Sequence, residues 1–294
     1  MDSWKKGLFQ YENTFNKKDN YLIHYSMKET REKHEVWNNN SFDNRSKTKY
    51  STTYIETILL EKKLSDILNK NLIKKNDLVG DFGCADGRIT DFLLRQSYNK
   101  IISVDYDLDN IITLSNNLKN THLNNVLPIV SDINKLGMKE EIFDCIIAWG
   151  VLSCTDDYDE SLKNLEKLIK DQGTLIISEP ILEHALIYSL IRNDISEFKK
   201  CVETSSRAAY WNDKETRYKV YRKSQIDSFI KNNKNFDLIE MDYISIFPSL
   251  IFGGILQEQE HSLEEKEELM KLCLDMDDKS FNFERQVVYV LKKK

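Results

Sequence analysis

Short apolar runs alternate with helical patterns between residues 77 and 180, and this alternation constrains the fold more than any other feature. Five runs have the length and composition of strands: 77–83, 100–106, 125–132, 142–150 and 173–180. Helical periodicity follows three of them, from Gly87, over 108–118 and over 159–169. Strands that are apolar on both faces and separated by helices form a parallel sheet covered on both sides. The sequence therefore predicts a doubly wound α/β fold, in which ligands bind beyond the carboxyl ends of the strands.

The flanking segments add further elements. Apolar residues recur every three or four positions over 52–72, which indicates an amphipathic helix. Residues 1–50 are polar and dotted with aromatic side chains, which is typical of short helices and loops that dock on another surface. Beyond residue 180, helices are expected at 181–191, 224–233 and 261–276, and strands at 217–222, 236–247 and 285–293. The remaining stretch, 195–216, has no clear pattern.

Composition excludes several classes of protein. The formal net charge of −6 lacks the basic excess of most duplex-binding proteins, so nucleic acid is not expected as a partner. The five cysteines are odd in number and form no C-x-x-C pair, so neither a disulfide framework nor a metal site is indicated. No apolar run approaches the roughly 18 residues of a membrane span, and the N-terminus lacks an apolar signal core. A cytoplasmic location is therefore expected.

The stretch LVGDFGCADGRITDFL, residues 78–93, concentrates glycine in a chain that contains only nine. A glycine turn between a strand and a helix lets a ligand approach the backbone, and the helix start offers unpaired N–H groups. The dinucleotide pattern G-x-G-x-x-G would need glycine where the chain has Ala85 and Arg88. The pattern acidic-x-G-x-G-x-G fits from Asp81 to Gly87 with one substitution, Ala85 in place of the middle glycine.

At this loop the sequence resembles the class I S-adenosylmethionine-dependent methyltransferases, whose glycine loop often reads D-x-G-C-x-x-G. The resemblance covers about residues 50–294. It implies S-adenosylmethionine as cofactor and a mostly parallel seven-stranded sheet whose last strand is antiparallel. It also implies a helical N-terminal lid over 1–71 and a core over 72–294, with a cap inserted after the fifth strand at about 181–223.

The resemblance also implies which residues bind the cofactor. The loop contributes Asp81, Gly83, Cys84, Ala85 and Gly87. Asp105 ends the second strand, close to the roughly 20 positions beyond the glycines at which a ribose-binding acid is expected.

Four more positions match the adenine and methionine sites of the family. Tyr106 matches a position that lies against the adenine. Asp132 matches the acceptor for the adenine amino group, with Ile133 beside the ring. Trp149 matches a position that faces the methionine part.

The residues after the fourth strand bear on the acceptor. Relatives that methylate amino groups of DNA and RNA carry [DNS]-P-P-[YFW] there, whereas this chain reads Ala148-Trp149-Gly150-Val151. The segment WGVLSC resembles the small-molecule branch, which implies methyl transfer to an oxygen or nitrogen atom of a biosynthetic intermediate. Three alternatives remain open: a tRNA acceptor, a peptide or protein acceptor, and a cofactor-binding subunit without activity. Aminopropyl transfer is disfavoured because Asp156 and Asp157 are the only acids in the matching place.

No catalytic residue is assigned from the sequence. Glu179 and His184 follow the fifth strand, where substrates bind, and His184 is a candidate base. Tyr50 is a further candidate for substrate contact. Weaker candidates for the substrate pocket are Trp37, Tyr54, Tyr210 and Trp211, and Arg45 is a weaker candidate for contact with the methionine carboxylate. For each of these residues the alternative is an ordinary packing or surface position.

Overall fold

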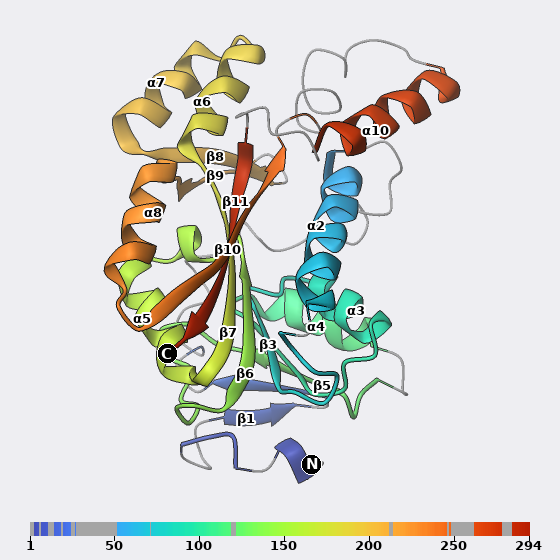
Figure 1. Ribbon diagram of the computed structural model, residues 1–294, viewed down its shortest axis with the longest axis vertical. Coiled ribbons are helices and arrows are strands. Elements are labelled where there is room, and N and C mark those ends of the chain that lie inside the picture. The colour runs from blue at the N-terminus through green and yellow to red at the C-terminus, as the bar shows by residue number, and fades with distance from the viewer. Residues whose placement is uncertain are drawn as a thin grey trace.

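The computed structural model describes residues 3–5, 7–10, 15–18, 20–24, 27, 52–70, 72–118, 122–211, 214–245, 247, 262–277 and 284–294. A central sheet of nine strands runs through the molecule, and helices pack on both of its faces (Figure 1). The strand order is β1-β2-β5-β4-β3-β6-β7-β11-β10. A separate two-stranded sheet pairs β8 with β9.

The strands are β1 (Phe15–Lys18), β2 (Tyr21–His24), β3 (Val79–Phe82), β4 (Ile101–Asp105), β5 (Val126–Val130), β6 (Phe143–Trp149), β7 (Ile169–Pro180), β8 (Ser206–Trp211), β9 (Lys214–Lys219), β10 (Phe236–Ser245) and β11 (Glu284–Lys293). The α-helices are α2 (Thr52–Asn69), α3 (Arg88–Arg95), α4 (Leu108–Asn117), α5 (Tyr158–Leu168), α6 (Leu182–Ile191), α7 (Ile195–Thr204), α8 (Lys223–Asn232) and α10 (Leu263–Asp277). Two short 3-10 helices are η1 (Ser3–Lys5) and η4 (Leu152–Cys154).

The five predicted parallel strands form the middle of the sheet. β4 and β5 lie on one side of β3, and β6 and β7 lie on the other, all parallel to it. The chain order therefore reverses at β3, and such a reversal opens a crevice at the carboxyl ends of the strands. All residues of β3 and β5 are buried, as expected for strands covered on both faces.

The last strand is antiparallel, as predicted. β11 lies between β7 and β10 and runs antiparallel to both. Its residues Val287 to Leu291 are buried, so this strand belongs to the core of the sheet.

The sheet has nine strands instead of the predicted seven, and the prediction of a helical N-terminal lid is wrong for residues 15–24. These residues form the β1–β2 hairpin, and β2 pairs in parallel with β5. The pairing covers an edge of β5 that would otherwise expose unpaired backbone groups. Leu22 and His24 are buried and alternate with partly exposed neighbours, but four residues are too short a pattern to reveal a strand.

Helix α2 also belongs to the core. Its buried residues Ile55, Leu59, Leu60, Leu64 and Ile67 pack in one cluster with side chains of the sheet and of α3. Figure 1 shows α2, α3 and α10 on one side of the sheet and α5 and α8 on the other. Among the described residues, α2 therefore packs with the core expected at 72–294 and does not form part of a separate lid over 1–71.

An insertion follows β7, as expected for residues 181–223. It consists of α6, α7 and the β8–β9 hairpin, and it lies at the carboxyl end of the parallel strands (Figure 1). A small cluster of its own holds it together: Leu182, Ala185, Cys201 and Val220. The stretch 195–216 supplies α7 and β8. Its sequence has no clear helical pattern because Cys201 is the only buried residue of α7.

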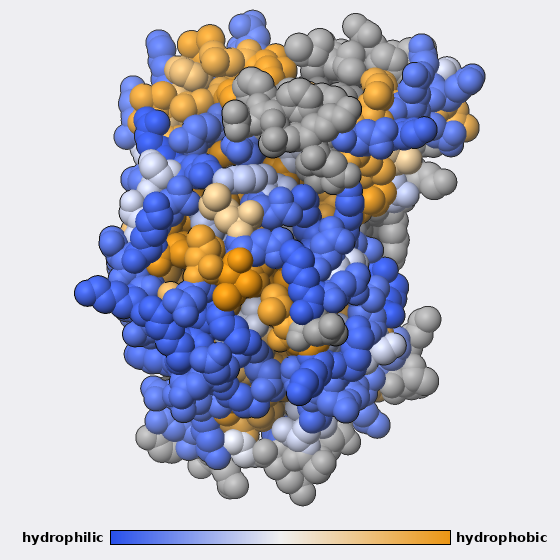
Figure 2. All heavy atoms as spheres, viewed as in Figure 1, coloured by the Kyte–Doolittle hydropathy of each residue, from blue (hydrophilic) through white to orange (hydrophobic). Residues whose placement is uncertain are grey.

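Apolar side chains also reach the surface. Leu190, Ile195 and Val202 are exposed on α6 and α7, and Leu238, Ile239 and Met241 on β10, and Figure 2 shows apolar areas over both regions. In the part of the chain that the structure describes, no helix combines the length and apolar composition needed to cross a membrane.

Candidate functional site

A cavity of about 1080 Å³ opens at the carboxyl ends of the parallel strands. One part is lined by the turns that follow β3, β4, β5 and β6. The other part is lined by the insertion, by the start of α2 and by the start of β11. The volume slightly exceeds the roughly 300–1,000 Å³ of common small-molecule sites, so two molecules of moderate size have room there.

The glycine turn forms one wall of the cavity. The backbone conformation of this turn explains why two of its positions are glycine. Gly83 and Gly87 have φ angles of +73° and +100°, which favour glycine. A Cβ atom on Gly83 would lie 2.5 Å from the Val151 side chain, and one on Gly87 would lie 2.4 Å from the Leu114 side chain. Ala85 adopts a φ of 46° in spite of its Cβ. The turn ends at Arg88, where α3 begins.

Asp105 meets this turn at the end of β4. One carboxylate oxygen accepts a hydrogen bond from the Ala85 N–H at 2.8 Å, and the other accepts from the Asp107 N–H at 2.9 Å. Burial raises the pKa of Asp105 to about 6. Since a carboxylate has about four lone-pair positions, Asp105 can accept further hydrogen bonds from a ligand in the cavity.

Asp81 lies deeper, within β3. Its side chain is buried and accepts a hydrogen bond from the Thr90 hydroxyl at 2.7 Å, and Thr90 in turn contacts Ser103 at 2.7 Å. Burial raises the pKa of Asp81 to about 7. A carboxyl group with this pKa lies at the cavity wall near the N-terminus of α3.

The structure brings nine of the ten predicted cofactor positions to one cavity wall. They are Asp81, Gly83, Cys84, Ala85, Asp105, Tyr106, Asp132, Ile133 and Trp149. Gly87 does not line the cavity, and its contribution is the left-handed backbone that ends the turn. Burial holds the pKa of the Cys84 thiol well above its usual range, so this thiol stays protonated.

Glu179 lies outside the cavity lining, contrary to the expected contact with a substrate. Its side chain is fully buried beneath η4 and accepts a hydrogen bond from the Ser153 N–H at 3.3 Å. Burial raises its pKa to about 8. Pro180, the next residue of β7, lines the cavity instead, because successive side chains of a strand point to opposite faces.

His184 also lies outside the cavity lining, behind Arg207. It is buried in α6, with its Nδ1 atom 3.4 Å from Nη1 of Arg207. Burial and the neighbouring guanidinium hold its pKa well below 6.5, so the ring is neutral near pH 7. The expected role of His184 as a base in contact with the acceptor is therefore not met in this structure.

The other candidates for substrate contact divide into two groups. Trp37, Arg45 and Tyr50 lie outside the described residues, and so do the side chains of Tyr210 and Trp211, which belong to β8. Tyr54 packs partly buried beside the core cluster under α2 and does not line the cavity.

Sequence reasoning missed the second part of the cavity. Its lining includes Thr53 and Glu56 of α2, Tyr188 and Arg192 of α6, Arg207 and Tyr218 of the hairpin, and Arg285 and Gln286 of β11. Glu56 forms an ion pair with Arg285, which joins α2 to β11. The four-residue spacing of Tyr188 and Arg192 on one helix could have revealed that pair, whereas nothing in the sequence marks Arg207.

No group of three or more histidine, cysteine, aspartate or glutamate side chains is arranged to hold a metal ion among the residues that the structure describes. The five cysteines are free, and Cys154 is the exposed one.

Comparison with known proteins gives a family match. Residues 73–225, about half of the chain, match the family described as a methyltransferase domain. No curated protein sequence matches the chain significantly.

Many solved structures share the fold at low sequence identity. An S-adenosylmethionine-dependent methyltransferase from Methanosarcina mazei is 14% identical, with 77% of this chain and 96% of that chain covered and a TM-score of 0.54. The 1,6-didemethyltoxoflavin-N1-methyltransferase from Burkholderia thailandensis is 15% identical, with coverage of 80% and 78% and a TM-score of 0.50. The [4+2]-cyclase SpnF is 13% identical, with coverage of 79% and 80% and a TM-score of 0.52. At such identities these likenesses show the fold alone.

Proposed function

Because this chain belongs to the methyltransferase domain family and is an S-adenosylmethionine-dependent enzyme, we propose that it methylates an oxygen or nitrogen atom of a small molecule. The observation that carries the proposal is the two-part cavity of about 1080 Å³. One part contains the predicted cofactor positions, and the other is lined by aromatic and charged side chains of the insertion. A biosynthetic intermediate is the class of acceptor that such a partly enclosed cavity fits.

We infer the cofactor position from the chemistry of the first part. Asp105 would accept hydrogen bonds from the ribose hydroxyls, and Asp132 would accept from the adenine amino group, with Ile133 against the ring. The turn at 83–87 and the start of α3 would face the methionine part, together with Trp149. These residues fit the cofactor because Asp105 keeps acceptor capacity and the wall beside it is backbone.

The chain's own contribution to the reaction is binding and orientation. S-adenosylmethionine supplies a methyl group on a positively charged sulfur, which is a good leaving group. The protein must therefore hold the acceptor atom in line and keep water out, which is worth several kcal/mol when the geometry is right. We assign no general base, since His184 and Glu179 lie outside the cavity lining. The insertion would serve as the cap that encloses the acceptor.

Two measurements test the proposal. Isothermal titration of S-adenosylhomocysteine should show binding at one site per chain, and absence of binding would contradict the cofactor assignment. Radiolabelled S-adenosylmethionine should then label a low-molecular-mass fraction of a cell extract, and not bulk tRNA or protein. Label in tRNA or protein alone would support a macromolecular acceptor, and tight binding without any turnover would support a non-catalytic subunit. A cytoplasmic location stays a prediction.

A further inference from the structure

Arg207 lies in the acceptor part of the cavity and has no acidic partner among the described residues. Its Nη1 atom is 3.4 Å from Nδ1 of His184, and its guanidinium lies 4.9 Å from the centre of the Tyr188 ring. Arg207 also interacts with the hydroxyl of Tyr218, which is half-buried and whose pKa is raised by burial. None of these three neighbours is an acidic residue, so the positive charge of Arg207 is not compensated by direct contact with them.

Three other arginines of the described chain are paired with acids. Arg217 donates to Glu197 at 2.7 and 3.2 Å, and Arg285 forms its ion pair with Glu56. Arg95 contacts Glu61 at 2.6 Å and Asp91 at 2.9 Å. An arginine without an acid, half-buried at a cavity wall, is the usual arrangement for binding a carboxylate or phosphate of a ligand.

A second guanidinium faces the same aromatic ring. Arg192 lies 5.6 Å from the centre of the Tyr188 ring, and its Nη1 atom donates to the Tyr188 hydroxyl at 3.2 Å. Two positive groups near one aromatic ring repel each other, and an anion that contacts both would offset that repulsion. Three acids of this part of the cavity, Glu56, Asp194 and Glu197, are engaged, and Glu56 forms its ion pair with Arg285. Asp194 accepts from the Glu197 N–H at 2.9 Å, and Glu197 binds Arg217.

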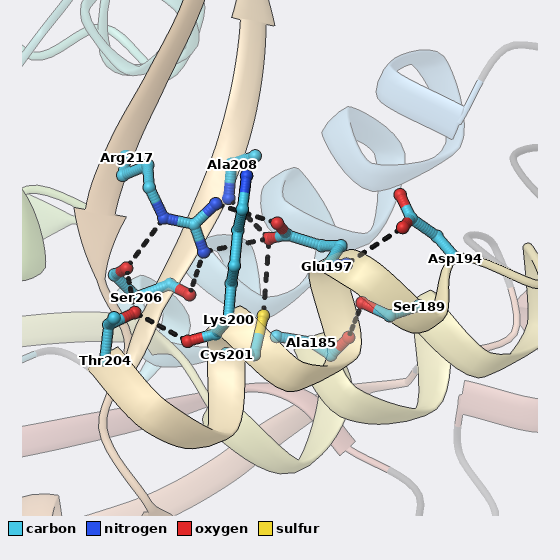
Figure 3. A network of polar contacts seen from close by, with 10 residues as sticks. All are labelled: Ala185, Ser189, Asp194, Glu197, Lys200, Cys201, Thr204, Ser206, Ala208 and Arg217. Carbon is cyan, nitrogen blue, oxygen red and sulfur yellow. Dashed lines mark hydrogen bonds and ion pairs between the residues drawn. The ribbon is translucent and has the colours of Figure 1, made fainter.

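A network around Glu197 fixes the strand that carries Arg207. One oxygen of Glu197 accepts from the Ala208 N–H at 2.8 Å, immediately after Arg207, and from the Cys201 thiol at 3.3 Å. Figure 3 shows the guanidinium of Arg217 between Glu197 and Ser206, to which it also donates at 2.9 Å. The bonds join α7 to both strands of the hairpin, so the backbone at Arg207 has little freedom to move.

His184 orients the guanidinium from behind. Arginine only donates hydrogen bonds, so Nδ1 of His184 must be the acceptor, and the proton of the neutral ring is on Nε2. His184 is therefore a positioning residue that directs Arg207 toward the cavity.

We propose that Arg207 is the specificity-determining residue for an acceptor that carries an oxyanion, either a carboxylate or a phosphate, bound between Arg207 and Arg192. This inference rests on the proposed function, because the oxyanion belongs to the molecule that is methylated. The aromatic ring of Tyr188 beside both guanidinium groups further favours an acceptor with a flat apolar part next to the anion.

The test measures binding of simple probes to the full chain saturated with S-adenosylhomocysteine. Benzoate and phenyl phosphate carry the two kinds of oxyanion, and benzamide is the neutral control. Titration calorimetry or ligand-observed NMR should show that at least one anion binds and benzamide does not. Arg207→Gln should weaken anion binding about tenfold or more, whereas Arg207→Lys, which keeps the charge but not the planar fork, should weaken it less. Stronger binding of benzoate or of phenyl phosphate identifies the oxyanion.

Matched controls separate this proposal from the proposed function. Arg95→Gln removes the same charge from a surface position outside the cavity and should leave anion binding unchanged. Affinity for S-adenosylhomocysteine should be equal in the wild type and in Arg207→Gln. A loss of cofactor affinity in Arg207→Gln would assign Arg207 to the cofactor carboxylate and overturn the proposal. Equal anion binding in both proteins, or none in the wild type, would also overturn it. If the wild type bound no cofactor, the proposed function would fail, and the anion titrations repeated without cofactor would still decide the role of Arg207.

Discussion

The buried carboxyl group of Glu179 should make the stability of the protein fall as pH rises. The side chain is fully buried, and it accepts a hydrogen bond from the Ser153 N–H at 3.3 Å. Burial raises its pKa from 4.5 to about 8, so the folded protein keeps the proton at neutral pH and the unfolded chain releases it. The stabilising contribution of the protonated group is fully present below about pH 4.5 and is lost progressively as the pH rises through 8.

The size of the effect follows from the two pKa values. At about 1.4 kcal/mol per pKa unit, the rise corresponds to about 5 kcal/mol of unfolding free energy at high pH. Glu179→Gln replaces the protonated carboxyl by an amide of the same shape, whose oxygen can still accept from the Ser153 N–H. We expect the variant to match the wild type within about 1 kcal/mol near pH 5 and to be about 4 kcal/mol more stable near pH 9.

Urea unfolding followed by tryptophan fluorescence measures this difference. The comparison should be made at about pH 5, 7 and 9 under reducing conditions, with the m value checked for constancy. Asp81 and Asp105 also have raised pKa values, but their contributions are common to both proteins and cancel in the difference. Parallel pH profiles for the two proteins would refute the reasoning, because they would show that Glu179 ionises in the folded state at its ordinary pKa.

Two further sets of variants test the cofactor wall. Asp105→Ala should weaken binding of S-adenosylhomocysteine by about 1–3 kcal/mol in titration calorimetry if its hydrogen bonds to the ribose are buried, whereas Asp109→Ala, on the exposed side of α4, should leave it unchanged. Wild-type affinity should also fall below about pH 6, where Asp105 takes up its proton, and a flat profile between pH 5 and 8 would contradict that assignment. Gly87→Ala should destabilise the fold by about 1–3 kcal/mol more than Gly150→Ala, because both residues have positive φ angles but only the Gly87 Cβ would meet another side chain, that of Leu114. Thermal unfolding of the two variants decides this point, and equal losses would show that Leu114 moves aside without cost.

Local patterns predicted the strands and the residues that line the first part of the cavity. The apolar runs at 77–83 and 100–106 become β3 and β4, and the predicted helix at 108–118 is α4. The distance along the chain between the glycine turn and Asp105 is set by one helix and one strand, so parallel pairing of β3 with β4 brings them together. The Ala85 N–H then donates to the Asp105 carboxylate. This contact follows from the pairing of the strands and not from any local sequence pattern.

Other features depended on contacts between distant segments. The β1–β2 hairpin packs on the open edge of β5, and its residues carry only a short strand pattern: β1 is polar, and β2 alternates over four residues. Glu179 and His184 lie close to the carboxyl edge in sequence, yet their side chains are buried beneath η4 and behind Arg207. The direction of a side chain at the end of a strand or helix depends on packing, which the local sequence does not specify.

The sequence by itself determined the parallel sheet, the glycine turn and the acids that follow β4 and β5. These features depend on hydrophobic periodicity and backbone conformation, which act between residues close together in the chain. Tertiary structure alone decided that α6, α7 and the β8–β9 hairpin would line one side of the cavity and that Arg207 would lie there without an acidic partner among the residues that the structure describes. That arrangement depends on burial and charge pairing between segments far apart in the chain. Local sequence does not specify these contacts, because they depend on which side chains meet in the folded protein.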